Sequence, residues 1–232
     1  MINLPWQIES LRKTYFFPLE SELTTTQLWK SIVQSDPSDR NEKHATRTIT
    51  EHGIWHDHML SVTFQPGRVD ILLNAIMNVP GLPNAGLFID LVDLFKDLKL
   101  TPSVVQASRI AFGAVLLVPE KSHQNCYETL GKLLSHVEIN QNSNQFIYRI
   151  NNPTQSTVIP NSFLNCISTW AALRVEFSTI SPSSITDSYA TRVELDINTD
   201  ANTLLGKELD VESIFDEMIL IGKQILVNGA RP

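Results

Sequence analysis

The densest group of side chains that could do chemistry is a histidine cluster around a Trp-His-Asp-His run. It contains His52, His56 and His58. If residues 56 and 58 belong to a strand, their imidazoles project from one face, because side chains two apart in a strand share a face. Two imidazoles on one face can bind a metal or act as acid and base in phosphodiester cleavage. The spacing alone favours a simpler interpretation, in which the two histidines are a partly exposed pair near a strand end and bind nothing.

A metal site would need more ligands than this cluster offers. Zinc takes three or four protein ligands. The two cysteines, Cys126 and Cys166, are far apart in the sequence and form no CxxC motif. Each falls in an apolar pattern, which is typical of a small core residue. We therefore expect no metal and no cofactor, and we assign no catalytic residue other than the alternative pair His56 and His58.

The acidic residues are concentrated near the end of the chain. The sequence has 25 Asp and Glu against 18 Lys and Arg, a net charge of −7. Residues 192–217 hold eight of these acids and two bases, a net charge of −6. Such a segment is either the solvated face of a strand and a helix or a surface that fits a basic protein partner. The predicted partner-binding residues are Glu194, Asp196, Glu208, Asp210, Glu212, Asp216 and Glu217.

A short basic stretch is the place where a nucleic-acid phosphate could bind. It contains Arg40, Lys43 and Arg47, opposed by Glu42. Three bases make a small electrostatic footprint, since affinity for nucleic acid rises with the number of phosphates contacted. The acidity of residues 192–217 argues against direct nucleic-acid binding by the last third of the chain.

Hydrophobic periodicity predicts a β-α-β-β-α-β order for the first half. Residues 35–51 have no apolar period and are predicted to be a solvated loop. Alternating residues on either side of Pro66-Gly67 predict a hairpin. The predicted elements are a strand at 8–19, a helix capped at Thr24, Thr25 or Thr26 and running to 33, the hairpin strands 60–65 and 68–73, a helix at 87–98 and a strand at 104–118. This is the ferredoxin-like order.

The second half is predicted to follow the order α-β-β-β-α. Its helices begin after Ser122 and after Asp210, both good N-caps, and the last one ends at Asn228-Gly229. Its strands are expected at residues 146–150, 173–177 and 193–197. The predicted fold class is α+β, with two lobes related to the ferredoxin-like fold and helices packed on one face of antiparallel sheets. The lobes would be residues 1–120 and 121–232, with one continuous domain as the alternative.

Composition narrows the class of protein. With 42% hydrophobic and 19% charged residues, the chain is expected to fold around an ordinary core. The first residues have neither a basic start nor a sustained apolar stretch, so no secretory signal is expected. The longest apolar run, residues 110–118, is about half of the ~20 residues that a membrane helix needs. We therefore expect a cytoplasmic protein without membrane contact.

Two resemblances bear on function. The tandem α+β order and the chain length resemble CRISPR RNA-processing endonucleases, which use a histidine, a basic RNA groove and a glycine-rich loop near the C-terminus. Here the last third is acidic and has only Gly206, Gly222 and Gly229. Residues 109–113, 195–199 and 214–218 resemble a sporadically distributed, uncharacterised family of prokaryotic α+β proteins, whose occurrence is like that of accessory genes such as anti-phage defence loci.

Together these observations favour a non-catalytic protein. The function they predict is an interaction or accessory subunit of a larger cytosolic prokaryotic assembly, with anti-phage defence as the setting that the second resemblance implies. The alternative is an RNA-processing or metal-dependent phosphodiesterase that uses His56 and His58.

Overall fold

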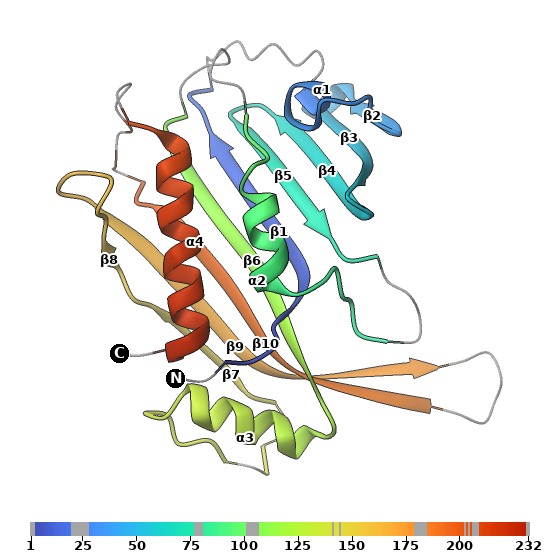
Figure 1. Ribbon diagram of the computed structural model, residues 1–232, viewed down its shortest axis with the longest axis vertical. Helices are drawn as coiled ribbons and strands as arrows, with labels where there is room; N and C mark the ends of the chain where they lie inside the picture. The colour runs from blue at the N-terminus through green and yellow to red at the C-terminus, as the bar shows by residue number, and fades with distance from the viewer. Residues whose placement is uncertain are drawn as a thin grey trace.

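A single antiparallel sheet of ten strands forms the body of the protein in the computed structural model (Figure 1). The structure describes residues 3–19, 28–76, 81–100, 107–140, 142–143, 145–178, 185–201, 203, 205 and 209–230. The strands are β1 (Gln7–Phe16), β2 (Asp39–Lys43), β3 (Thr48–Trp55), β4 (His58–Gln65), β5 (Arg68–Asn74), β6 (Arg109–Glu120), β7 (Ile147–Asn151), β8 (Thr154–Gln155), β9 (Phe163–Ser178) and β10 (Ile185–Thr199). They are ordered β2-β3-β4-β5-β1-β6-β10-β9-β7, and β8 pairs with β9.

The described helices all pack on one face of this sheet. They are α1 (Leu28–Val33), α2 (Phe88–Phe95), α3 (His123–Leu133) and α4 (Val211–Asn228), with a 3₁₀ turn at His44–Thr46. Figure 1 shows α2 and α4 side by side across the middle of the sheet. The apolar core lies beneath them, and the side chains of Phe112, Leu195 and Ile197 reach Gly222 of α4. None of the described helices is both long and apolar enough to cross a membrane.

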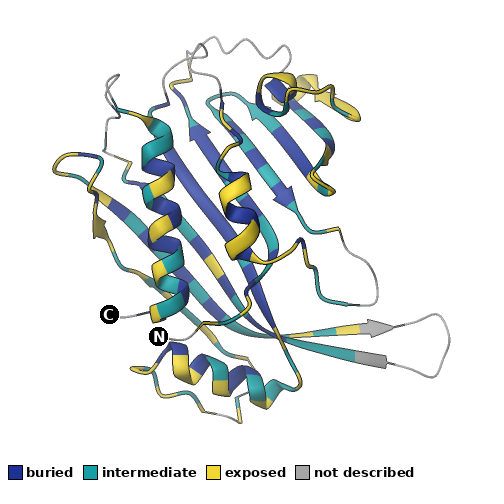
Figure 2. Cartoon of the chain, in the orientation of Figure 1, coloured by how far each residue is buried: buried dark blue, intermediate teal, exposed yellow. Residues whose placement is uncertain are grey.

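The opposite face of the sheet carries no described helix, and we call it the helix-free face. Along β5 and β10, fully buried residues alternate with partly exposed ones, whereas β6 between them is buried at most positions, as the colours of Figure 2 show. On β10, for example, Val193, Leu195 and Ile197 are buried, whereas Glu194 and Asp196 between them are more exposed. Because successive side chains of a strand point to opposite faces, this alternation defines a covered apolar face and an open polar one.

Several predicted elements are confirmed. The hairpin of β4 and β5 turns at Pro66-Gly67, where Gly67 has a φ of 77°. Ser122 caps α3 by accepting a hydrogen bond from the Asn125 N–H, and Asp210 caps α4 by accepting one from the Glu212 N–H. The predicted cap at Thr24, Thr25 or Thr26 and the predicted strand start at residue 104 lie outside the described residues.

The prediction of two ferredoxin-like lobes is wrong. Strand β6, which ends the first half, pairs with β10 of the second half over ten positions, from Glu120↔Tyr189 to Ala111↔Asn198. Its other edge pairs with β1. The near-continuous apolar run of β6 therefore reflects a strand in the centre of one sheet, not the edge of a lobe. The division of the chain at residue 120 stays a prediction.

The predicted loop at residues 35–51 is also wrong, because it contains β2 and the first half of β3. Every residue of β2 is exposed, so this edge strand shows no apolar alternation. The buried positions of β3 are Ile49, Glu51 and Gly53, which hide the period because only the first of them is apolar. The ring of Trp29 fills the space at Gly53, where an added Cβ would lie 2.5 Å from it.

Candidate functional site

The three histidines do not form a common site. His56 and Asp57 occupy the two-residue turn between β3 and β4, with φ values of 46° and 65°, a geometry typical of a tight hairpin. The condition for the two imidazoles to share a strand face, that residues 56 and 58 both belong to a strand, is therefore not met. His52 pairs with Ser61 on the helix-free face. Among the described residues, no group of three His, Cys, Asp or Glu side chains could hold a metal ion.

The predicted acidic surface is divided between two faces of the sheet. Glu194 and Asp196 lie on the helix-free face of β10. The other described members of the set, Asp210, Glu212, Asp216 and Glu217, belong to the start of α4 on the covered face, and Glu208 lies outside the described residues. The structure therefore brings four of the acids together but separates them from the other two.

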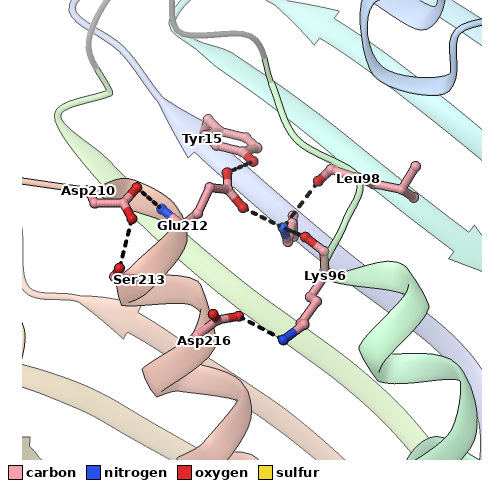
Figure 3. A network of polar contacts seen from close by, with 8 residues as sticks. Tyr15, Lys96, Leu98, Asp210, Glu212, Ser213 and Asp216 are labelled. Atoms are coloured by element: carbon pink, nitrogen blue, oxygen red, sulfur yellow. Dashed lines mark hydrogen bonds and ion pairs between the residues drawn. The ribbon is translucent and has the colours of Figure 1, made fainter.

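Glu212 is bound inside the protein by a buried lysine (Figure 3). The Lys13 side chain is 0% exposed, and its Nζ donates to Glu212 Oε2 at 2.9 Å and to the carbonyl oxygens of Lys96 and Leu98 at 2.7 and 3.1 Å. The Tyr15 hydroxyl donates to Glu212 Oε1 at 3.1 Å. Burial lowers the pKa of Lys13, although the charge of Glu212 opposes this effect. Burial also raises the pKa of Tyr15 well above its ordinary value.

The other acids of α4 also have partners within the chain. Glu217 accepts hydrogen bonds from the Ser156 and Thr157 hydroxyls at 2.6 and 2.7 Å. Burial raises the pKa of Glu217, but these hydrogen bonds outweigh burial and hold the pKa below its ordinary value. Asp216 lies 3.8 Å from Lys96 Nζ. The network of Figure 3 therefore joins α4 to β1 and to the segment after α2, which is a structural role for Glu212 and Asp216.

The predicted basic residues do not converge either. Arg40 donates to Glu51 Oε1 at 2.8 Å, and Glu51 Oε2 accepts the backbone N–H of Trp29 at 2.8 Å. This nearly buried carboxylate thus ties β2 to the start of α1. Lys43 lies an odd number of residues from Arg40 and so points to the other face of β2. Arg47 follows the 3₁₀ turn in a left-handed conformation, with a φ of 50°.

An apolar cavity lies where α2 begins and α4 ends. Its volume is about 300 Å³, and its lining includes Leu4, Trp6, Ile89, Leu226 and Val227, with Lys223 at its polar part. Apolar side chains near it are unusually exposed, at 38% for Leu87, 62% for Ile89 and 55% for Leu220. The two helices are joined here by an ion pair between Lys223 Nζ and Asp93 Oδ1 at 3.0 Å. We call the outer side of α2 and α4 with this cavity the α2–α4 surface.

The helix-free face holds a second concentration of polar groups that sequence reasoning missed. Five of the nine arginines of the chain project from it, each from a different strand: Arg12, Arg68, Arg109, Arg149 and Arg192. Phe16 lies between two of them, with the Arg68 and Arg109 guanidinium carbons 5.4 and 5.2 Å from its ring centroid. In the sequence, each of these arginines occupies a polar position of a strand, which predicts that it is exposed. Only the strand order shows that the five arginines share one face.

Comparisons with protein-family models, with curated proteins and with solved structures gave no match for this chain. The protein is therefore classed by its structure alone: a ten-stranded antiparallel sheet with the described helices on one face, a cavity on the helical side and an arginine-bearing face on the other side.

Proposed function

We propose that the protein is a non-catalytic accessory subunit of a larger cytosolic assembly, of the kind that anti-phage defence loci encode, and that it docks a basic protein partner on the α2–α4 surface. The observation that carries the proposal is the cavity of about 300 Å³ bordered by exposed Leu87 and Ile89. Exposed apolar side chains beside a concave apolar site are typical of interaction surfaces, where an anchor side chain of the partner fills the pocket.

Charge gives the expected chemistry of the partner. Lys223 is paired with Asp93, and Lys96 with Asp216. Asp90 and Asp97 are exposed, and neither makes an ion pair with a described residue. These uncompensated aspartates favour a partner with basic residues around an apolar anchor, because complementary rim charges steer association and exclude partners of the same sign.

The structure changes which acids support this proposal. Glu212 and Glu217 are committed to hydrogen bonds within the chain, and Glu194 and Asp196 lie across the sheet from the cavity. Asp210 is committed to capping α4. Of the described acids in the predicted set, Asp216, with its side chain 57% exposed, therefore remains at the proposed surface. The alternative, an RNA-processing or metal-dependent phosphodiesterase using His56 and His58, has less support, because His56 lies in a turn and not on a strand face shared with His58.

The test is native co-purification with a matched pair of variants. Ile89→Lys places a charge at the cavity, on the side of α2 that faces α4. Leu94→Lys makes the same change on the opposite flank of α2, at a side chain that is 47% exposed. The tagged wild-type chain, expressed in its source organism, should purify with a stoichiometric partner, and quantitative mass spectrometry should find that partner with Leu94→Lys but not with Ile89→Lys.

Two results would contradict the proposal. One is a wild-type chain that purifies alone as a monomer. The other is a partner that is retained equally by Ile89→Lys and Leu94→Lys, because that partner would not occupy the cavity. Circular dichroism of both variants tests whether they are folded, which separates loss of the surface from unfolding.

A further inference from the structure

The register of the central strands places an aromatic ring between two cations on the helix-free face. Phe16 of β1 pairs with Arg68 of β5 on one side and with Arg109 of β6 on the other. Arg109 also donates from its Nε and Nη2 to the carbonyl oxygen of Thr199 at 3.4 and 3.3 Å, which holds its guanidinium in place. Both guanidiniums lie over the Phe16 ring, which holds the three side chains together as one platform. A planar ligand can stack on the outer guanidinium planes of this platform, because bases stack on arginine as well as on aromatic rings.

Arg12 lies four residues before Phe16 on the same face of β1, about 13 Å along the strand. Its neighbour on β6 is Gly113, and an added Cβ there would lie 3.4 Å from Arg12 Nη2 and 3.5 Å from Nε. The arginine side chain therefore extends across the space that a larger residue would fill. Its Nε is buried without a hydrogen-bond partner, and no ion pair joins its guanidinium to a described residue.

The charges of this face leave an excess of cations. Arg68 is paired with Asp70 at 2.7 Å, and Arg192 lies 3.4 Å from Glu9 and 3.5 Å from Glu194. On strands β5, β1, β6, β10, β9 and β7, this face therefore carries five arginines against the four carboxylates of Glu9, Asp70, Glu194 and Asp196, a net charge of +1. Arg12, Arg109 and Arg149 are the arginines without a carboxylate partner. The local charge is positive, although the whole chain has a net charge of −7.

A row of amides completes the face. Asn151 Nδ2 donates to Asn165 Oδ1 at 3.1 Å, Asn165 Nδ2 to Asn198 Oδ1 at 3.2 Å, and Asn198 Nδ2 to Asp196 Oδ1 at 3.1 Å. Each of these amide nitrogens has two N–H donors and uses one in the row. The second donor of each can bind an oxygen or nitrogen acceptor of a ligand lying on the sheet.

We propose that the helix-free face binds a single-stranded nucleic acid, with a base stacked on the guanidinium of Arg68 or Arg109 that Phe16 supports and phosphates bound by Arg12 and Arg149. The cations extend from β5 to β7, five strand spacings or about 24 Å, which is long enough for several nucleotides. A stacking ring, separated arginines and a row of amide donors match the three parts of a nucleotide: base, phosphate and base edge. An acidic peptide would use the arginines but would have no group for the Phe16 platform.

The experiment measures fluorescence anisotropy of labelled poly-U RNA and poly-dT DNA of about 12 nucleotides, at about 50 mM salt. The wild-type protein should bind, and the slope of log affinity against log salt should be about −1.4 for the two phosphate contacts. Arg12→Glu and Arg149→Glu should each weaken binding about ten- to hundredfold and make the slope less steep by about 0.7. Phe16→Leu should weaken binding about five- to hundredfold with an unchanged slope.

Lys132→Glu is the matched control, because it makes the same charge change at an exposed position of α3 on the covered side of the sheet. Its oligonucleotide affinity should equal that of the wild type. Arg12→Gln replaces Arg12→Glu if thermal unfolding shows that the reversed charge destabilises the fold.

Absence of wild-type binding to either oligonucleotide overturns the proposal. Poly-glutamate that displaces the oligonucleotide equally well from wild type and from Phe16→Leu also overturns it, because the face would then recognise acidic chains in general.

This proposal does not depend on the protein partner proposed above. Ile89→Lys changes the α2–α4 surface and should leave oligonucleotide affinity unchanged, whereas Arg12→Glu changes the helix-free face and should leave the co-purified protein unchanged. Either binding activity can therefore fail while the other is observed.

Discussion

Removal of the Glu212 carboxylate should destabilise the fold far more than its place in an acidic segment suggests. Lys13 is completely buried, and Glu212 is its one anionic partner in Figure 3. Glu212→Ala leaves the ammonium with the two carbonyl oxygens of Lys96 and Leu98 and leaves the Tyr15 hydroxyl without its acceptor. Breaking one side of a buried ion pair costs about 3 to 5 kcal/mol.

The partial exposure of Glu212 places the cost of Glu212→Ala near the lower end of that range. The Glu212 side chain is 22% exposed, so water can approach the vacated position and partly solvate the ammonium. We expect a loss of about 3 kcal/mol in the free energy of unfolding. For a chain of this length the midpoint temperature should fall by about 6 to 12 °C. Urea unfolding followed by tryptophan fluorescence measures the loss directly, provided that the m-value is unchanged.

Two further variants make this prediction specific. Asp216→Ala, one turn along α4, removes a partner 3.8 Å from the Lys96 ammonium in an exposed pair and should cost less than about 1 kcal/mol. The double variant Lys13→Met/Glu212→Leu removes both charges and should recover most of the stability lost in Glu212→Ala, because the desolvation cost of the ion pair disappears with it. If Glu212→Ala were no more destabilising than Asp216→Ala, the assignment of Glu212 as the essential partner of Lys13 would be refuted.

Three more perturbations test the packing and the titrating groups. Gly53→Ala should lower the free energy of unfolding in urea by about 1 to 3 kcal/mol, because its Cβ would lie 2.5 Å from the buried Trp29 ring. Gly131→Ala on α3 meets open space and should raise the free energy of unfolding by up to about 1 kcal/mol. Equal effects of the two substitutions would contradict the tight fit at Trp29. The Glu217 pKa is below its ordinary value of 4.5, so its contribution to stability is complete above that pH and is lost as the pH falls through the folded-state pKa. Glu217→Gln should therefore flatten the acid side of the stability profile measured in urea, and an unchanged profile would exclude this role. Burial raises the pKa of Cys126 to about 12 and also raises that of Cys166, so a disulfide reagent at neutral pH should label both thiols in urea and neither in the folded protein. Rapid labelling of either thiol without urea would contradict the burial of that cysteine.

The local elements could be predicted because their determinants are close together in the sequence. Ser122 and Asp210 cap the helices that follow them, and Pro66-Gly67 turns the hairpin between two alternating strands. Strand β3 was missed because two of its buried positions hold Glu51 and Gly53. Glu51 is tolerated there because Arg40 and the Trp29 N–H bind it, and neither contact is visible in a hydrophobic pattern.

The long-range arrangement could not be predicted, because it depends on contacts between distant parts of the chain. Glu212 binds Lys13 across 199 residues, so nothing near either residue marks the pair. The same is true of strand order: the apolar run of β6 predicts a buried strand but not that β10 would be its neighbour. The acidic segment was therefore predicted as one surface, whereas the pairing of β10 with β6 and the packing of α4 over β6 divide it between two faces.

The division of the acidic segment 192–217 between two faces also changes what the net charge of the chain predicts about nucleic-acid binding. A charge of −7 predicts repulsion of nucleic acid if it is spread evenly over the molecule. Here Glu212 neutralises a buried lysine, and Glu217 and Asp210 bind hydroxyl and amide groups, so much of the acidity lies on the helical side of the sheet. Arginines collect on the other side, where alternation alone decides which residues are exposed. Because screening limits exposed charges to a range of about 8 to 10 Å, a ligand on the helix-free face responds mainly to the arginines and carboxylates of that face and only weakly to the acids of α4.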